Sequence, residues 1–155
     1  MQQHPIDTTA QRRRVRHILV IEDSSGRRTV SLEAATYSLG RDPSSALVLH
    51  SNYVSRQHAI LLRVPVPGEA SHLYRIIDGN SKGELSTNGI AINGKRQTSC
   101  DLKHGDRIFF SRDTTATYYV AINLSDDEFS QYASSAGYRS LKLEVEDPSL
   151  TTLEA

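Results

Sequence analysis

Residues 36–64 have the sequence TYSLGRDPSSALVLHSNYVSRQHAILLRV, which contains three short runs typical of β-strands. The runs are TYSL at 36–39, ALVL at 46–49 and HAILLRV at 58–64. The segments between them hold Gly, Pro, Ser and Asp, which favour turns and loops. This stretch therefore predicts three successive strands joined by short connections.

Similar runs continue on both sides of this stretch. They are HILVIE at 17–22, RTVSLE at 28–33, LYRIID at 73–78, GIAIN at 89–93, KRQT at 95–98, DRIFF at 106–110 and TYYVAIN at 117–123. Several runs alternate apolar and polar residues, which indicates strands with one buried face. Because no convincing helical period interrupts residues 15–124, the sequence predicts an all-β fold, an antiparallel β-sandwich.

Three connections between these runs carry further information. Asn93-Gly94 is a strong signal for a tight hairpin, because both residues tolerate a positive φ. Residues 64–72 and 78–87 are rich in turn formers and predict longer connections. In the first of them, Pro65 and Pro67 cannot donate to a strand ladder. Long loops on a rigid sandwich are common binding sites, so both segments are candidates.

Charge and composition divide the chain into three parts. Residues 1–14 are polar and lack an apolar period, which predicts a flexible basic arm. Residues 15–124 form the predicted domain. Residues 125–155 hold 2 Lys and Arg against 7 Asp and Glu. We expect an acidic tail that is mostly disordered, with one short helix opening at the acidic run 126–128.

Length and composition exclude several classes of protein. The 155 residues suffice for one ordinary core but not for two. The sequence has no run of eighteen apolar residues and no secretory signal, so we expect a cytoplasmic protein without membrane insertion. The single cysteine, Cys100, and six histidines without recurrent metal spacing predict no structural metal site and no cofactor.

A discontinuous set of polar residues lies in the loops between the predicted strands. It consists of Gly40-Arg41, Ser55-Arg56-Gln57-His58, Ser86-Thr87-Asn88-Gly89 and Asn93-Gly94. Each string alone is common, but together GR, SRxH and SxNGxxxNG resemble the signature of the forkhead-associated (FHA) family over residues 16–123. The resemblance implies a β-sandwich of about eleven strands that binds phosphothreonine in partner proteins.

The chemistry of a phosphate monoester fits these residues independently of the resemblance. Such a group carries about −1.5 to −2 charge near pH 7 and three strong acceptor oxygens. The planar guanidinium of Arg41 can donate a fork of hydrogen bonds to it, and Ser55 adds an uncharged hydroxyl donor. Arg56 brings a second cation, and backbone N–H groups can complete the pocket.

The resemblance also implies a role for each residue of the set. Positions matching Arg41 and Ser55 hold the phosphate, and the position of Arg56 also contacts it. Thr87 is implied to lie beside the phosphothreonine methyl group, and Asn88 to bind the adjacent peptide backbone. The residues implied to support the site structurally are Gly40, His58, Gly89 and Asn93.

The sequence thus predicts a non-catalytic phosphothreonine-peptide-binding module that acts in signal transduction on partners prepared by a Ser/Thr kinase. One alternative is a phosphate-independent interaction scaffold. Another is self-association through the chain's own phosphorylated termini, at Thr8, Thr9, Thr151 or Thr152.

Two further classes of function are disfavoured. Ser55 and His58 are residue types that can serve as a catalytic nucleophile and its base. The motifs that accompany catalysis are absent from the sequence, however: it has no GxSxG, P-loop, HExxH or paired CxxC. The basic string RRRVRH at 12–17 lacks the interleaved aromatic residues of nucleic-acid stacking platforms. The sequence therefore predicts neither an enzyme nor a nucleic-acid-binding protein.

Overall fold

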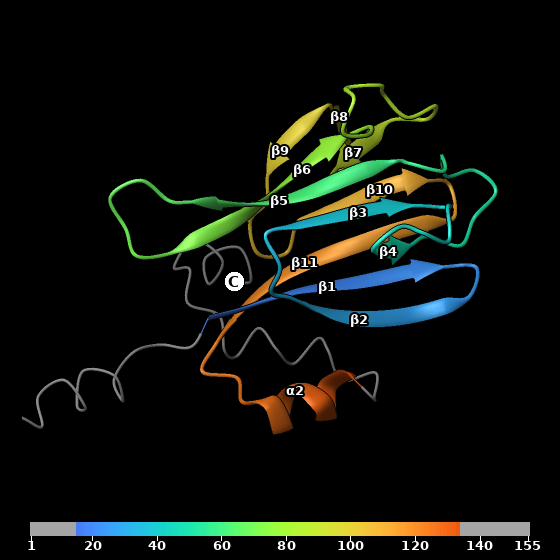
Figure 1. Cartoon of the computed structure of the whole chain (residues 1–155). Helices are drawn as coiled ribbons and strands as arrows, with labels where there is room; N and C mark the ends of the chain where they lie inside the picture. The colour runs from blue at the N-terminus through green and yellow to red at the C-terminus, as the bar shows by residue number, and fades with distance from the viewer. Residues whose placement is uncertain (1–14, 134–155) are drawn as a thin grey trace, which may run out of the picture. The chain divides into compact units, whose positions relative to one another are not determined.

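A computed structural model of the chain describes residues 15–133 and contains eleven strands and one helix in that range. The strands form two sheets that face each other (Figure 1). The expectations for the arm at 1–14, for the tail beyond 133 and for the threonines within them lie outside the described residues.

The first sheet has six strands and the second has five. In spatial order, the first sheet contains β2 (Gly26–Leu32), β1 (Val15–Asp23), β11 (Thr114–Ile122), β10 (Arg107–Ser111), β7 (Ile90–Ile92) and β8 (Lys95–Gln97). The second contains β4 (Leu47–Val48), β3 (Thr36–Gly40), β5 (Ala59–Pro65), β6 (His72–Asp78) and β9 (Ser99–Asp101). The predicted all-β sandwich of about eleven strands is confirmed.

Two details depart from the sequence prediction. β3 and β4 form a short parallel pair, with Leu39 opposite Leu47, a detail that the predicted antiparallel sandwich did not include. β9 was not predicted, because its three residues lack the β-branched and aromatic side chains that favour strands. It forms by pairing along the edge of β6, where Cys100 lies opposite Ile76. Cys100 thus belongs to an edge strand.

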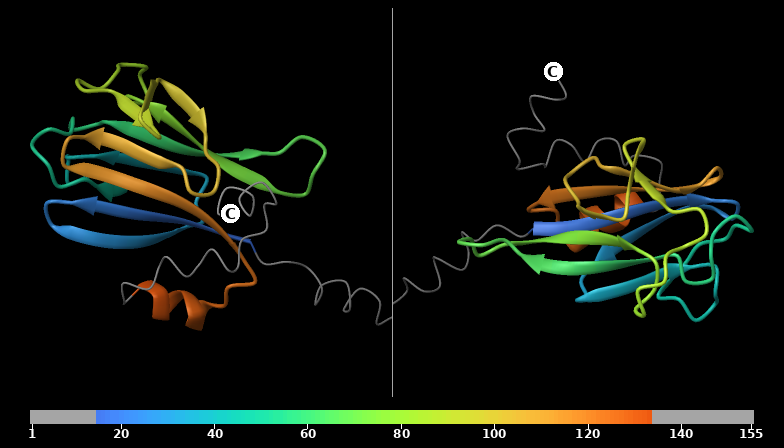
Figure 2. Two further views of the ribbon diagram at one scale, coloured as in Figure 1. Left: turned by 180° about the vertical axis from the view of Figure 1, so that it is seen from behind. Right: turned by 90° about the horizontal axis from the view of Figure 1, so that it is seen from above.

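The connection predicted at 64–72 is present but shorter than predicted. The pairing of β5 with β6 continues to Pro65 opposite His72, so the connection shortens to residues 66–71. Pro65 is accommodated because it is the last strand residue, where a missing donor breaks no interior ladder bond. Val66 then donates its backbone N–H to the Ser71 carbonyl at 3.0 Å. This hairpin lies at the opposite end of the sandwich from the β3–β4 and β10–β11 connections (Figure 2).

The core lies between the two sheets and follows the strand period of two. In β6, Tyr74, Ile76 and Asp78 are buried, while the residues between them are half-buried. Leu61 of the neighbouring β5 and Leu39 of β3, the next strand along, are fully buried. Each such apolar side chain contributes about 1.5–3 kcal/mol when fully removed from water. The loops are therefore attached to a well-packed scaffold.

The Asn93-Gly94 turn joins β7 to β8 as predicted. Ile92 lies opposite Lys95, so the turn has two residues, with φ of 54° at Asn93 and 86° at Gly94. Asn93 also donates its side-chain amide to Asp106 at 2.9 Å, and its amide oxygen accepts the Arg107 N–H. The side chain thus ties the hairpin to the start of β10.

The described chain divides into two compact units, residues 17–119 and, from the two ends, residues 15–16 with 120–133. In the second unit, α2 (Asp126–Ala133) begins with a capping box. The Ser125 hydroxyl oxygen accepts the Glu128 N–H at 3.1 Å, and the Glu128 carboxylate accepts the Ser125 N–H at 2.9 Å. Within the described residues this eight-residue helix is the only one, and it is too short to cross a bilayer.

A cluster of histidine and tyrosine rings is buried near the β5–β6 hairpin. The rings of His17 and His72 stack with their centres 4.7 Å apart, and Tyr74 packs against both. The His17 Nδ1 lies 2.5 Å from the Tyr118 hydroxyl. Burial lowers the pKa of His17 from 6.5 to about 4, and the neighbouring His72 and Arg63 act in the same direction. His17 is therefore neutral in the folded protein near pH 7.

We expect the domain to lose stability as the pH falls from 6.5 towards 4. In this interval the unfolded chain protonates His17 and the folded chain does not, so the free energy of unfolding decreases. Between pH 7 and pH 4.5 the loss from His17 alone is about 2.5 kcal/mol. Urea unfolding at the two pH values measures it, with the His17→Gln variant as the control that flattens the dependence. Equal unfolding free energies of the wild type at both pH values would contradict this account.

Candidate functional site

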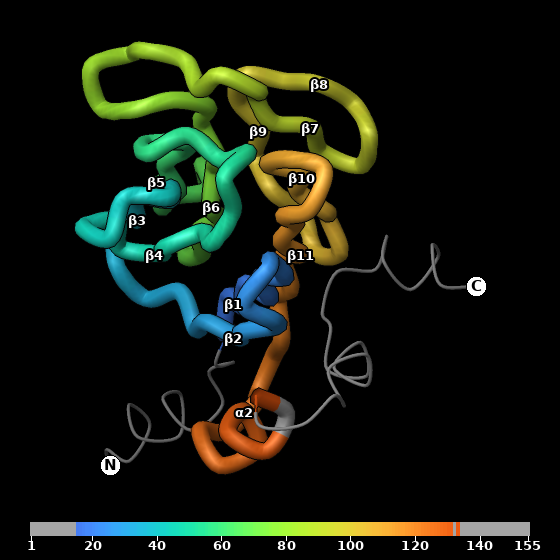
Figure 3. Tube along the Cα trace, turned by 90° about the vertical axis from the view of Figure 1, so that its right-hand side faces the viewer, coloured from blue at the N-terminus to red at the C-terminus, as the bar shows by residue number. Residues whose placement is uncertain are grey.

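Four loops come together at one end of the sandwich, which faces the viewer in Figure 3. They are the β3–β4, β4–β5, β6–β7 and β10–β11 connections, and we call this end the loop end. All five residues predicted to bind ligand lie on these loops: Arg41, Ser55, Arg56, Thr87 and Asn88. Backbone and side-chain hydrogen bonds join the loops to each other.

The β3–β4 and β4–β5 loops meet through backbone hydrogen bonds. Arg41 donates its N–H to the Ser55 carbonyl at 3.0 Å, and Asp42 donates to the Arg56 carbonyl at 3.1 Å. Gly40 permits this approach, since a Cβ at that position would lie 2.0 Å from the Arg56 carbonyl oxygen. No side chain fits there without moving backbone. The glycine thus places Arg41 beside Ser55.

The Arg41 side chain is exposed and held at one point. Its Nε donates to the Val54 carbonyl at 2.9 Å. Its two terminal nitrogens donate to no group in residues 15–133, and no carboxylate there pairs with them. A guanidinium that is anchored through Nε keeps both terminal nitrogens for an external acceptor. Arg41 therefore presents a preorganised fork of donors.

Arg56 differs from Arg41 because an acidic neighbour pairs with it. Its terminal nitrogen lies 3.5 Å from the Asp42 carboxylate, and its side chain is 71% exposed. Hydrogen bonds from Ser44, followed by the charge of Arg56, lower the pKa of Asp42. The pair leaves Arg56 with less uncompensated charge than Arg41. We therefore expect Arg41 to dominate the attraction of an anion.

His58 connects the β4–β5 loop to the β6–β7 loop beneath the surface. Its Nδ1 accepts the Ser55 backbone N–H at 3.0 Å, and its Nε2 lies 2.8 Å from the Gly89 carbonyl. The ring must therefore carry its proton on Nε2 and donate it to Gly89. Burial lowers the pKa of His58, which keeps the ring neutral. Both nitrogens are thus occupied, and neither is available as a base for the Ser55 hydroxyl.

Ser55 and Asn88 make further bonds between the same two loops. The Ser55 hydroxyl oxygen accepts the Thr87 N–H at 2.9 Å, and its own hydrogen is donated to no group in the described residues. The Asn88 amide donates to the Tyr53 carbonyl at 2.6 Å. The exposed Thr87 and Asn88 side chains lie next to Ser55 in consequence. At Gly89, which follows them, φ is +73°, a value that disfavours residues with a Cβ.

The β6–β7 loop is shaped by residues to which the sequence analysis gave no role. The buried carboxylate of Asp78 accepts the Ser86 hydroxyl at 2.6 Å, and the Ser86 oxygen accepts the Gly89 N–H at 2.9 Å. The Asn80 amide oxygen accepts the backbone N–H groups of Lys82 and Glu84. An Asp at a strand end followed by Gly and Asn is a signal for such a closed turn.

Asp113, in the β10–β11 turn, is a second residue whose role the sequence did not predict. One of its oxygens accepts the hydroxyls of Ser51 at 2.6 Å, Ser111 at 2.7 Å and Thr114 at 3.0 Å. The Ser51 hydroxyl oxygen in turn accepts the Tyr53 N–H. These hydrogen bonds lower the pKa of Asp113. The carboxylate therefore ties the β10–β11 turn to the β4–β5 loop.

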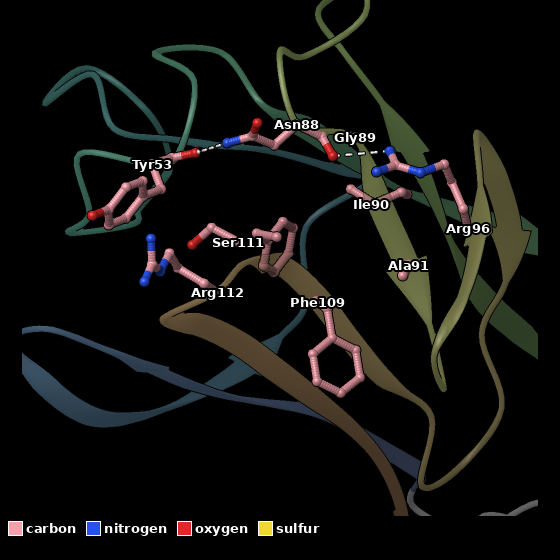
Figure 4. Close-up of a pocket in the computed structure, with 10 residues that line it drawn as sticks. Tyr53, Asn88, Gly89, Ile90, Ala91, Arg96, Phe109, Ser111 and Arg112 are labelled. Atoms are coloured by element: carbon pink, nitrogen blue, oxygen red, sulfur yellow. Dashed lines mark hydrogen bonds between the residues drawn. The ribbon is translucent and has the colours of Figure 1, made fainter.

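A pocket of about 390 Å³ opens at the loop end beside Asn88 (Figure 4). Its floor includes Ile90, Ala91 and Phe109, and the Tyr53 ring stands at one side. Within residues 15–133, no group of three His, Cys, Asp or Glu side chains is arranged to hold a metal ion.

Comparison with known proteins identifies the family. Residues 37–111 match the family model described as FHA domain. The Slr1951 protein of Synechocystis sp. is 39% identical, with a TM-score of 0.63 over 66% of this chain and 96% of that chain. The chain belongs to the FHA-domain family.

Two further relatives of this FHA domain extend the comparison. The yeast Dun1 FHA domain, solved by NMR with a doubly phosphorylated (pT) peptide derived from Rad53, is 26% identical with a TM-score of 0.52, covering 68% of this chain and 74% of that chain. The uncharacterized protein sll1895 of Synechocystis sp. is 36% identical over 100 residues, 64% of this chain. The present chain spans only 14% of that relative.

Proposed function

We propose that this FHA domain binds phosphothreonine in partner proteins that a Ser/Thr kinase has prepared. The observation that carries the proposal is the anchored Arg41, whose terminal nitrogens have no partner within residues 15–133 and which lies beside Ser55. The Dun1 FHA domain, which shares the fold, was solved with a phosphothreonine peptide, and this supports the same ligand class here.

The phosphate would lie between Arg41 and Ser55. Arg41 would donate two charge-assisted hydrogen bonds from its terminal nitrogens, and Ser55 would donate its unused hydroxyl hydrogen. Arg56 would add a second, partly neutralised cation at the rim. His58 contributes by holding the Ser55 backbone, without contacting the ligand. Every interaction in this arrangement binds the phosphate, and none breaks a bond in it.

Residues of the β6–β7 loop would contact the parts of the bound peptide that adjoin the phosphate. Thr87 would pack against the phosphothreonine methyl group, which serine lacks. Asn88 already donates to the Tyr53 carbonyl, so its amide oxygen remains for a backbone N–H of the peptide. Together these contacts would favour phosphothreonine over phosphoserine and an extended peptide over free phosphate.

A degenerate peptide library with one fixed phosphorylated residue tests the proposal. We expect fluorescence anisotropy at physiological salt to show binding of the phosphothreonine library, weaker binding of the phosphoserine library and none of the unmodified threonine library. One methyl group in an apolar contact is worth about 1 kcal/mol, so the first two should differ about fivefold. Equal binding of the threonine and phosphothreonine libraries would refute the proposed function.

A further inference from the structure

The β1–β2 turn, residues 24–25, lies at the loop end next to β4 (Figure 1). At its base the side-chain carboxylate of Asp23 is fully buried and pairs with the Arg28 guanidinium at 3.1 Å. The Arg28 Nη2 also donates to the Val48 carbonyl at 2.6 Å. Because Val48 belongs to β4, the pair connects the edge of the first sheet to the edge of the second.

The same turn holds the start of the β4–β5 loop at His50. The second Asp23 oxygen accepts the His50 N–H at 2.8 Å, and Ser24 donates its hydroxyl to the His50 carbonyl at 2.6 Å. Burial acts to raise the pKa of Asp23, but hydrogen bonds, led by that of Arg28, lower it to about 2. The carboxylate is therefore charged near pH 7. We call Asp23, Ser24 and Arg28, with their bonds to residues 48–50, the β1–β2 clamp.

The loop that the clamp holds leads to the anchor of Arg41. Ser51 follows His50, and its carbonyl accepts the Val54 N–H at 3.3 Å. The Val54 carbonyl in turn accepts the Arg41 Nε–H at 2.9 Å. An arginine side chain has several rotatable bonds, so the acceptor at Nε decides where its terminal nitrogens point. The direction of the Arg41 fork therefore depends on how the β4–β5 loop places Val54.

We propose that Asp23 and Arg28 are positioning residues of the phosphopeptide site, which act on Arg41 through the β4–β5 loop. The inference rests on the phosphopeptide binding proposed above. Neither residue of the pair would touch the peptide. Without the clamp, the start of the loop and the Val54 carbonyl would gain freedom, and Arg41 with them. The peptide would then have to order these groups on binding, which lowers affinity.

The Asp23→Asn variant separates positioning from plain electrostatics by the sign of its effect. The substitution removes a negative charge from the domain that binds an anion, so charge alone would tighten binding. Loss of the charged pair with Arg28 should instead weaken binding about fivefold, as expected for coupling through a hydrogen-bonded network. Fluorescence anisotropy of one phosphothreonine peptide at physiological salt measures the Kd of the whole domain and of the variant.

Variants of Arg28 test the other half of the pair. Arg28→Gln should also weaken binding about fivefold. Arg27→Gln is the matched control, because it removes the same charge from the adjacent, exposed residue, and it should change the Kd less than twofold. Asp23→Asn combined with Arg28→Gln should bind about as weakly as either single variant, since two residues that act as one unit do not give additive effects.

A loss of stability alone should not reproduce this result. Tyr74→Phe removes the hydrogen bond from the Tyr74 hydroxyl to the Ala34 carbonyl, 2.7 Å long, near the opposite end of the sandwich. It should lower the free energy of unfolding, measured with urea, and leave the peptide Kd unchanged. A domain that stays almost wholly folded binds with its full affinity. The peptide Kd thus distinguishes a positioning role from a merely structural one.

The exchange of the Arg41 Nε–H with water, measured by NMR without peptide, reports on the anchor itself. It should be about fivefold faster in Asp23→Asn than in the wild type or in Tyr74→Phe. Unchanged exchange, or unchanged or tighter peptide binding by Asp23→Asn, overturns the proposal. If that variant does not fold, equal Kd values of Arg28→Gln and Arg27→Gln overturn it.

Binding by the wild type separates this inference from the function on which it rests. Failure of the unaltered domain to bind the phosphothreonine peptide would overturn the proposed function, and this inference with it. Binding by the wild type that persists at full strength in the clamp variants would overturn the inference alone.

Discussion

Replacing Arg41 with alanine is expected to abolish detectable binding of phosphothreonine peptides and to leave the domain folded. The substitution removes the two terminal nitrogens that we assign to the phosphate. Charge-assisted hydrogen bonds contribute about 1.5–3 kcal/mol each, so two of them account for a loss of about 100-fold or more in affinity. Titration calorimetry with a single phosphothreonine peptide measures this loss directly.

The fold should tolerate the change because the Arg41 side chain is exposed. Only the Val54 carbonyl loses a donor, which lowers the free energy of unfolding by about 1 kcal/mol. Arg41→Lys should also bind poorly, because a point charge cannot replace the planar fork. Lys103→Ala controls for the loss of one positive charge. An Arg41→Ala protein with near-wild-type affinity would remove Arg41 from the site.

The second large effect is expected from Gly40→Ala, which should destabilise the whole domain. The new methyl group would lie 2.0 Å from the Arg56 carbonyl oxygen and 2.7 Å from its carbonyl carbon. Both are backbone atoms, so relief requires the β4–β5 loop to move away from β3. Overpacking of this kind costs about 3 kcal/mol or more. The same displacement separates Arg41 from Ser55, so peptide binding should weaken as well.

Gly68→Ala is the matched control for this variant. Gly68 has a φ of +77°, but a Cβ there meets nothing within 4 Å. Its replacement tests backbone conformation without a clash and should cost about 1 kcal/mol. Urea unfolding of both variants and of the wild type gives the comparison. A Gly40→Ala protein that is no less stable than Gly68→Ala would show that the close approach of the two loops is unimportant.

The sandwich was predictable because each strand and turn follows from a pattern of residues that are adjacent in the sequence. Alternating burial in β6 and the Asn93-Gly94 turn follow from neighbouring residues alone. The connection at 64–72 was predicted too long for the same reason. Pro65 signals a break in isolation, but the register of β5 against β6 places it at a strand end, where it is harmless.

The supports of the candidate site were harder to predict because they depend on residues distant in sequence. Asp113 and Ser51 are 62 positions apart, and their hydrogen bond forms only when two loops meet. The stacking of Arg112 on Tyr53 depends on the same meeting. A local pattern predicts that a loop exists, but which side chains of two loops touch is decided by sheet order. The sequence motif predicted Arg41 and Ser55 as site residues, whereas the contacts between loops that hold them in place are seen only in the structure.

NMR titration of the labelled domain with a phosphothreonine peptide tests the central claim most directly. We predict that the backbone amides of Ser55, Thr87 and Asn88 and the side-chain Nε–H of Arg41 shift on addition of the phosphopeptide. The unmodified threonine peptide should leave them unchanged. Shifts confined to the β5–β6 hairpin at residues 66–71, or equal shifts with both peptides, would contradict a phosphothreonine site at the loop end.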